Sequence, residues 1–390
     1  MKCCSAYSHA RANVAVEFIR PAIFAALFAL LVPSVAAAQP IRVLLATHQL
    51  QTVVASEGGL VVRGENGPGA PLFAPEVTTV VSVRPQAGGL LLADALMAGP
   101  QISIRPLLDA PLSVDGRPYR GSVTIARSDD GTLSVVNELE LEQYLYGVVG
   151  AEMDPAWPET ALQVQAIAAR SYAVSRIALR EHPDFDLIAG DKDQAYGGID
   201  SESQGPVDAV DSTRSVVLVY RYHVIAAYYS SCDGGYTADG SELEDPEPYL
   251  QSKPDPYAGE SPHLAWSANV PLADFAQAFR EQVGDIGDIT SIKAEGADAS
   301  GRVTSIAVTG TTGNIKITGE QFRKAAGRRL VKSTRIASLA LAGDSILVRG
   351  SGYGHGVGLS QWGAKGMADQ GLGIYAILSF YYSGTMLSRI

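Results

Sequence analysis

The 390-residue sequence contains few cysteines: Cys3, Cys4 and Cys232 are all it has. Cys3 and Cys4 precede an apolar run in the N-terminal segment, so they do not form a lipoprotein cleavage box. If that segment is removed, Cys232 is left without a partner and no intramolecular disulfide can form. Stability must then come from packing, and a chain with 46% hydrophobic residues can bury a sizeable core.

Long hydrophobic runs are also scarce. The main hydrophobic run is AIFAALFALLV at 22–32. It follows a short basic stretch and precedes small residues near Ala38. This order predicts a signal peptide over residues 1–38 and export of the remaining chain. The alternative is an uncleaved signal that anchors the chain in the membrane, but the run is short for a spanning helix.

Positive charge is in deficit. The chain has 30 Lys and Arg against 41 Asp and Glu, which gives a formal net charge of −11. Three of the basic residues and one acidic residue lie in the predicted signal peptide, which leaves 27 against 40. Because such an acidic chain does not attract polyanions, we expect no nucleic-acid partner.

The first third of the remaining chain has the pattern of an antiparallel β unit. Residues 41–135 are rich in short β-branched runs separated by Gly, Pro and Asp-Gly breaks. The clearest hairpin is RSDDGTLSVV, whose turn is expected at Asp130 and Gly131. The sequence therefore predicts a β-rich N-terminal unit.

The apolar spacing then becomes helical from Leu141 to Val149, and a second helix is expected to begin at Pro158. The segment between them, within GVVGAEMDPAWP, contains Glu152. A carboxylate in such apolar surroundings has a raised pKa and lowers stability unless it is used or paired. The structural alternatives for Glu152 are capping of the second helix or an ion pair with Arg170.

Further along, residues 208–242 alternate well enough for a pair of strands. Residues 265–345 mix strands with two amphipathic helices, Leu272 to Val283 and Gly319 to Leu330, the latter with Glu320 in its first turn. We expect this segment to form a second lobe.

The C-terminal segment is dense in glycine. Glycines occupy every second position from 350 to 358 around His355, and Ser360, Gln361 and Trp362 follow. This spacing predicts unusual backbone dihedrals and a polar and aromatic cluster on the loop. The loop fits neither a phosphate-binding nor a dinucleotide-binding pattern, and the sequence has no G-x-S-x-G elbow. A purely structural loop histidine is the alternative for His355.

Three segments of the chain resemble the signature blocks of the SpoIID/LytB family, which includes stage II sporulation protein D and the amidase enhancer. They are LELEQYLYGVVGAEMDPAWPETALQVQAIAARSYAVSR, YYSSCDGGYT and SGYGHGVGLSQWGAKGMADQGLGIYAILSFYYSGT. Their order is that of the family, and they extend over roughly residues 120–390. Together with the sequence patterns, the resemblance leads us to expect an α+β fold. A β-rich unit over 39–120, outside the resemblance or only loosely attached to it, precedes a two-lobed core over 121–390 that contains a cleft. The second lobe is expected at about 265–345.

The resemblance also implies a peptidoglycan lytic transglycosylase in the periplasm or cell wall, acting on glycan strands stripped of stem peptides. The catalytic glutamate of the family matches Glu152, and a cleft arginine matches Arg170. The further residues expected to contact the glycan are Tyr172, His355, Ser360, Gln361 and Trp362. One glutamate suffices because the muramyl 6-hydroxyl is the nucleophile, whereas ordinary glycosidases use two carboxylates. Asp154, two residues away, leaves a paired-carboxylate mechanism open.

Two other functions are weighed against this one. The first is a peptidoglycan-binding activator of a cell-wall amidase, which would bind the glycan in the cleft without cleaving it. A protease or esterase acting through Cys232 or Ser360 is disfavoured, because Cys232 has no convincing local histidine partner and no G-x-S-x-G elbow occurs. No cofactor is expected. Some relatives bind zinc through a histidine and paired cysteines, but Cys232 has no second cysteine and only His223 nearby, so it is expected to pack as a small buried residue.

Overall fold

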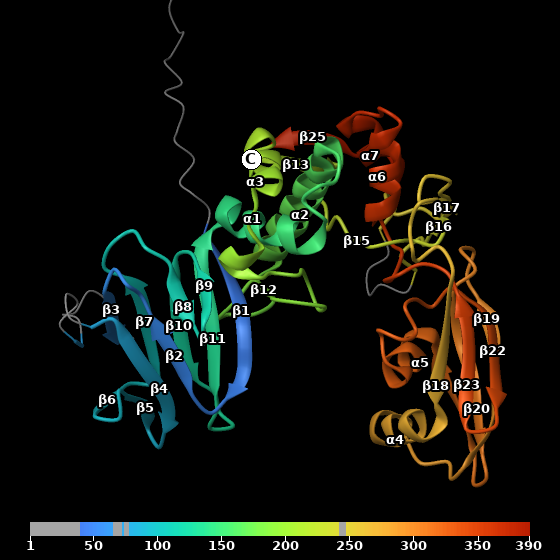
Figure 1. Ribbon diagram of the computed structural model, residues 1–390, viewed down its shortest axis with the longest axis horizontal. Helices are drawn as coiled ribbons and strands as arrows, with labels where there is room; N and C mark the ends of the chain where they lie inside the picture. The colour runs from blue at the N-terminus through green and yellow to red at the C-terminus, as the bar shows by residue number, and fades with distance from the viewer. Residues whose placement is uncertain (1–39, 65–71, 74–77, 242–246) are drawn as a thin grey trace, which may run out of the picture. The chain divides into compact units, whose positions relative to one another are not determined.

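The computed structural model describes residues 40–64, 72–73, 78–241 and 247–390. The predicted signal peptide and its apolar run lie outside these ranges. Within them, no helix combines the length and the apolar character needed to cross a membrane. The described chain is α+β with a β-rich N-terminal region, as predicted (Figure 1).

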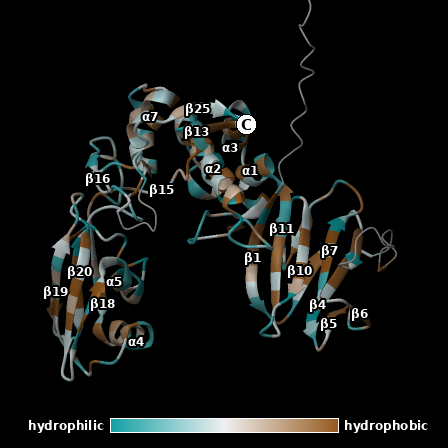
Figure 2. Cartoon of the chain, turned by 180° about the vertical axis from the view of Figure 1, so that it is seen from behind, coloured by the Kyte–Doolittle hydropathy of each residue, from teal (hydrophilic) through white to brown (hydrophobic). Residues whose placement is uncertain are grey.

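Two six-stranded sheets make up the N-terminal part of the described chain, with strand orders β12-β1-β11-β10-β7-β3 and β6-β5-β4-β2-β8-β9. In Figure 1, β1, β11 and β10 run side by side, and Figure 2 shows apolar residues along all three. The strands of the two sheets are β1 (Pro40–Gln49), β2 (Thr52–Ala55), β3 (Leu60–Gly64), β4 (Val80–Gln86), β5 (Gly89–Leu92), β6 (Leu96–Ala98), β7 (Gln101–Pro106), β8 (Leu112–Val114), β9 (Arg117–Tyr119), β10 (Ser122–Arg127), β11 (Leu133–Glu140) and β12 (Leu187–Ile188).

The predicted hairpin is confirmed, since β10 and β11 pair antiparallel and Gly131 in their turn has a φ of +82°. Alternate residues of β10, such as Val123 and Ile125, are buried in the core of this region. Because β10 and β11 lie in the middle of the first sheet, that sheet continues past residue 120.

Two helices follow β11 directly. Helix α1 (Leu141–Glu152) and helix α2 (Glu159–Leu179) agree with the predicted pair, and Pro158 is the N-cap of α2. Both helices share the core of the first sheet through residues such as Leu145 and Ala166. Helix α1 is longer than predicted, so Glu152 is its last residue and does not lie in the linker.

Two glycines in α1 allow a neighbouring segment to approach closely. A Cβ built on Gly147 would lie 2.9 Å from the carbonyl oxygen of Gly198, and one on Gly150 would overlap the carbonyl oxygen of Ser201. Both contacts are with backbone, which cannot move aside as a flexible side chain can. The small residues of GVVGA therefore allow the segment beginning near Ala195 to pack against α1.

Gly150→Ala is expected to lower the free energy of unfolding by about 1–3 kcal/mol, because the added methyl group must push the Ser201 carbonyl away. Urea unfolding measures this difference. Gly259→Ala is the matched control, since a Cβ at this exposed position meets no atom within 4 Å. Equal unfolding midpoints for the two variants would contradict the close approach.

The middle of the chain is less regular. The prediction of two strands over residues 208–242 is wrong for residues 208–212. They belong to helix α3 (Gln204–Ser212), which buries Ala209 and Val210. The other elements are η1 (Gly198–Ser201), β13 (Val216–Tyr220), β14 (His223–Val224), β15 (Tyr229–Ser230), β16 (Tyr236–Thr237) and β17 (Lys253–Pro254).

Residues 266–348 contain a second hydrophobic core with two three-stranded sheets in the described chain, β18-β23-β22 and β19-β20-β21. The first turn of α5 carries Glu320, as predicted, behind a capping box formed by Thr318 and Gln321. Helix α5 ends earlier than predicted because Gly327 has a φ of +88°. The elements are β18 (Trp266–Pro271), α4 (Leu272–Gln282), β19 (Ile289–Ala297), β20 (Val303–Gly310), β21 (Asn314–Thr318), α5 (Gly319–Ala326), β22 (Ile336–Ala342) and β23 (Ser345–Gly350).

The glycine-dense loop and the C-terminal helices complete the chain. Gly352, Gly354, Gly356 and Gly358 all have φ between +69° and +106°, as the spacing of the glycines predicts. The loop leads into β24 (Leu359–Ser360), α6 (Gln361–Asp369), α7 (Ile374–Tyr381) and β25 (Met386–Arg389).

Candidate active site

Glu152 is half-buried and accepts hydrogen bonds from three distant parts of the chain. Its Oε1 accepts from the Ala195 N–H at 2.8 Å and from the Tyr229 hydroxyl at 3.4 Å. Its Oε2 accepts from Nε2 of Gln361 at 3.2 Å. Glu152 neither caps α2 nor pairs with Arg170, so neither of its two structural alternatives is observed.

The surroundings of Glu152 act on its pKa in opposite directions. Burial raises the pKa of its carboxyl, whereas the hydrogen bonds from Ala195, Gln361 and Tyr229 lower it, and the net shift is upward. Burial and the negative charge of Glu152 raise the pKa of Tyr229 well above its usual value, so this hydroxyl stays a donor. The carboxyl is thus held in a fixed position with its proton more tightly bound than in water.

A short parallel strand pair brings Tyr229 and Gln361 to Glu152. Strand β15 pairs with β24, and the Trp362 N–H donates to the Ser231 carbonyl at 3.0 Å. The hydroxyl of Ser360 accepts from the Gly363 N–H and caps α6. Because α6 begins at the next residue, the side chain of Gln361 lies in its first turn, where it contacts Glu152.

Tyr229 is oriented by a buried network behind it. Nε2 of Gln194 donates to the Tyr229 hydroxyl oxygen at 2.9 Å, and the Tyr144 hydroxyl donates to Oε1 of Gln194 at 3.1 Å. Since the Tyr229 oxygen already accepts from Gln194, its own proton is available for Glu152.

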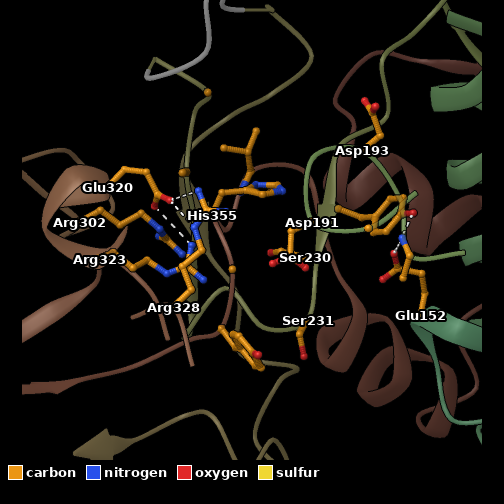
Figure 3. A pocket seen from close by; sticks show the side chains of 18 of the residues that line it. Glu152, Asp191, Asp193, Ser230, Ser231, Arg302, Glu320, Arg323, Arg328 and His355 are labelled. Carbon is orange, nitrogen blue, oxygen red and sulfur yellow. Dashed lines mark hydrogen bonds and ion pairs between the residues drawn. The ribbon is translucent and has the colours of Figure 1, made fainter. Parts of the chain in front are cut away.

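Glu152 lies in the wall of a pocket of about 610 Å³, a size that suits a ligand of several sugar rings. Figure 3 shows Glu152 and Asp193 on one side, Arg302, Arg323 and Arg328 with Glu320 on the other, and Asp191 between them. The described residues of the lining are Glu152, Gly190, Asp191, Asp193, Ala195, Tyr229, Ser230, Ser231, Ala238, Asp239, Gly240, Ser241, Asp298, Arg302, Glu320, Arg323, Arg328, Arg329, Tyr353, Gly354, His355 and Val357.

Asp154, which left a paired-carboxylate mechanism open, is not part of this lining; its Oδ1 accepts from the Ala156 N–H at 2.9 Å in the turn after α1. Asp193 is in the lining but accepts from the Tyr172 hydroxyl and the Ile188 N–H. Asp191 is exposed in the pocket, and its negative charge raises the pKa of Glu152. If a second carboxylate assists Glu152, Asp191 is in the better position.

His355 lines the pocket, and its Nδ1 accepts from the Val357 N–H at 3.0 Å. Desolvation by the pocket wall and then the positive charge of Arg302 lower the pKa of His355. The imidazole is therefore neutral at neutral pH, with its proton on Nε2.

Arg170 does not line the pocket, contrary to expectation. Its guanidinium has no exposed surface and forms a bidentate pair with Glu142, in which Nη2 lies 2.7 Å from Oε2. It also donates to the carbonyl oxygens of Val216 and Val210. The apolar helix stripe buries Arg170 along with its neighbours, and Glu142 on α1 neutralises it. This geometry is that of a structural residue.

Two other expected contact residues are buried outside the pocket. Tyr172 packs in the core, with its hydroxyl donating to Asp193 at 2.7 Å, and Ser360 is fully buried as the cap of α6. Trp362 is half-buried, and its ring lies 4.8 Å from that of Trp157 in an edge-on arrangement. Of the residues expected to contact the glycan, only His355 lines the pocket. Gln361 instead donates a hydrogen bond to Glu152.

Cys232 is buried with no disulfide partner, and burial raises the pKa of its thiol. Its role as a small packed residue is confirmed. Among the described residues, no three His, Cys, Asp or Glu side chains come together as metal ligands would.

Gln361→Leu is expected to raise the pKa of Glu152 further, because the substitution removes a hydrogen bond that favours the carboxylate. A carbon NMR titration of labelled glutamate side chains measures this shift. Gln370→Leu, an exposed change at the end of the same helix, is expected to leave the titration unchanged. An unaltered titration of Glu152 in Gln361→Leu would contradict the contact.

Two of the three groups that donate to Glu152, Tyr229 and the Ala195 N–H, are not predicted from the sequence. Tyr229 lies in the second signature block, so a polar residue in that block was the available signal. Ala195 contributes only backbone, and its sequence environment carries no signal for this role.

Comparison with known proteins agrees with the resemblance. The family described as "Stage II sporulation protein" matches residues 129–220, and a domain of unknown function matches residues 249–358. An uncharacterized protein of Brachyspira hyodysenteriae is 34% identical over 280 residues, which is 70% of this chain and 73% of that protein.

Two relatives from Bacillus subtilis have descriptive names. Stage II sporulation protein D is 29% identical over 274 residues, 65% of this chain and 76% of that protein. The amidase enhancer is 27% identical over 357 residues, 79% of this chain and 50% of the enhancer, so the match spans half the enhancer's length.

Proposed function

The chain belongs to the SpoIID/LytB family, and from this membership we propose that it is an exported lytic transglycosylase that cleaves peptidoglycan glycan strands. The observation that carries the proposal is the single half-buried Glu152, held by Ala195, Tyr229 and Gln361 in the wall of a large pocket. Membership of the family supports a role at the cell wall, and the site supports the reaction.

In the proposed reaction, protonated Glu152 donates its proton to the glycosidic oxygen as the bond to the muramyl anomeric carbon breaks. The carboxylate then accepts the proton of the muramyl 6-hydroxyl, whose oxygen bonds to the same carbon. The products are a shortened strand with a free hydroxyl and a 1,6-anhydro-muramyl end. No water is consumed, and Glu152 ends in the protonation state in which it began.

The contacts of Glu152 suit both halves of this cycle. The raised pKa keeps a proton available, while three donors stabilise the carboxylate formed on donation. Oε1 accepts two hydrogen bonds and Oε2 one, so Oε2 has more capacity to hold the exchanging proton. We assign proton transfer to Oε2 and positioning to Tyr229 and Gln361.

Contacts with the sugar are proposed for pocket residues and for aromatic rings near the site. His355 and Tyr353 line the pocket, and neutral His355 suits hydrogen bonding to uncharged hydroxyls. The half-buried rings of Trp157 and Trp362 flank the residues that hold Glu152 and offer apolar faces for stacking on sugar.

The second candidate is a peptidoglycan-binding activator of a cell-wall amidase. The observation that favours it is the similarity to a protein named amidase enhancer. An activator needs the pocket for binding but places no demand on the pKa of Glu152.

The full chain incubated with stem-free glycan strands tests the proposal. Mass spectrometry is expected to find fragments whose muramyl ends are lighter than hydrolysed ends by one water. In parallel, intact wall material is incubated with an amidase, with and without the chain. Faster release of stem peptides together with uncut glycan strands would favour the activator instead.

A further inference from the structure

Four arginines line the same pocket as Glu152: Arg302, which donates to the backbone carbonyls of Tyr236 and Asp233, and three that belong to α5 or follow it. Arg323 belongs to the last turn of α5, and Arg328 and Arg329 follow the helix after Gly327. Figure 3 shows Arg323 and Arg328 across the pocket from Glu152. The φ of +88° at Gly327 ends the helix and turns the chain, so residues from both sides of this glycine line the pocket. We call Arg323, Arg328 and Arg329 the arginine cluster.

Internal contacts hold two members of the arginine cluster in place. Glu320 accepts from both, with its Oε2 3.3 Å from Nη1 of Arg323 and its Oε1 2.8 Å from Nη2 of Arg328. Nε of Arg323 also donates to the Val331 carbonyl at 3.0 Å. The two guanidinium groups are therefore positioned before a ligand arrives.

The charges of the arginine cluster exceed what its own contacts neutralise. Glu320 is one carboxylate against three guanidinium groups, and Arg329 is exposed and forms no ion pair with an acidic group of the described chain. The surplus of positive charge belongs to the arginine cluster together with Glu320 and not to the whole pocket, whose lining also contains the carboxylates of Glu152, Asp191, Asp193, Asp239 and Asp298. Attraction to the C-terminal end of α5 accounts for a basic residue in its last turn, but not for two more that line the pocket beyond it.

We propose that the arginine cluster is a subsite for a carboxylate carried by the glycan strand. Planar guanidinium groups match carboxylates through paired hydrogen bonds, and the cluster and Glu152 share one pocket. This proposal rests on the proposed function, because it assumes that a glycan strand occupies the pocket. It adds that the enzyme selects its strand by charge at a distance from the bond that is cut.

Two parts of peptidoglycan can supply this carboxylate. In stripped strands, each muramyl residue carries a lactyl group that ends in a free carboxylate. In strands that keep their stem peptides, the lactyl carboxyl is an amide and the carboxylates belong to the peptide. Chito-oligosaccharides have the same sugar backbone without a carboxylate, so they provide an uncharged ligand of matched length.

Binding of these three ligands to the full chain tests the proposal, with Glu152→Gln as the background so that no strand is cut. With the arginine cluster unchanged, we expect the chain to bind a carboxylate-bearing strand about tenfold more tightly than it binds the chito-oligosaccharide, because charge-assisted hydrogen bonds contribute this much. Added salt is expected to reduce this preference. Arg328→Gln with Arg329→Gln is expected to remove it while leaving chito-oligosaccharide binding unchanged.

Arg280→Gln is the matched control, because Arg280 is an exposed arginine at the end of α4 that lies outside the pocket lining. It is expected to keep the preference. Thermal unfolding of each variant checks that the exposed substitutions leave the fold intact.

Preference for the stripped strand identifies the lactyl carboxylate, and preference for the peptide-bearing strand identifies the stem peptide; either supports the subsite. Equal binding of charged and uncharged ligands, or an equal loss for all ligands in the double variant, would overturn the subsite and leave the proposed function standing. Failure of all three ligands to bind would overturn the proposed function together with it.

Discussion

Glu152→Gln is expected to reduce the release of anhydro-muramyl ends by about 10²–10⁴-fold, the usual range for loss of a positioned acid or base. The amide is close in shape to the carboxyl and keeps an oxygen for the Ala195 N–H, but it neither donates nor accepts the exchanging proton. Initial rates on stem-free strands, measured by mass spectrometry of the new ends, give the ratio.

The loss of activity in Glu152→Gln is expected without a loss of stability. Burial raises the pKa of Glu152 in the folded chain, so wild-type stability decreases as pH rises from the unfolded pKa to the folded one. Glutamine does not ionise, and the variant should be at least as stable as the wild type at neutral pH. Asp154→Asn, in the adjacent turn but outside the pocket, is the matched control and should retain activity.

Arg170→Met is expected to lower the free energy of unfolding by about 3–5 kcal/mol, the largest stability effect we predict. The substitution leaves the buried carboxylate of Glu142 with one remaining backbone donor, Ser215, and removes the donor to the Val216 carbonyl. Urea unfolding measures the change. Arg214→Met is the control, since Arg214 pairs with Glu140 at the surface and its loss should cost no more than about 1 kcal/mol.

The double variant Arg170→Met with Glu142→Leu distinguishes this structural role from a catalytic one. Replacing both partners of a buried pair by apolar side chains removes the unpaired charge, so the double variant should be more stable than Arg170→Met alone. Where it is folded, its KM for stem-free strands should equal that of the wild type. A raised KM in a fully folded double variant would return Arg170 to the binding site.

Local patterns predicted the elements of the fold well. The Asp130 and Gly131 turn, the helix after Pro158 and the capping box at Thr318 are each encoded within a few residues. The errors occurred where longer-range packing decides the outcome. Residues 208–212 carry an ambiguous short pattern, and burial of Ala209 against the core makes them helical.

The site was predictable where a residue type limits the chemistry. From the residues alone, Glu152 stood out as a carboxylate in an apolar segment and Gln361 as part of the polar cluster after the glycine loop, but the catalytic role of Glu152 was predicted from the family resemblance. Arg170 was misplaced because its sequence position does not reveal that Glu142, one helix earlier, is its partner. The arginine cluster was not anticipated, since its three residues read as the polar face and end of an amphipathic helix until the pocket brings them opposite Glu152.

The central claim is that Glu152 transfers protons in a reaction whose nucleophile is the substrate's own hydroxyl. Digestion of stem-free strands in water enriched in heavy oxygen tests it most directly, with mass spectrometry of the new muramyl ends. The account predicts unlabelled anhydro ends from the wild-type chain and almost none from Glu152→Gln. Labelled reducing ends from the wild-type chain, or anhydro ends at an equal rate from Glu152→Gln, would contradict it.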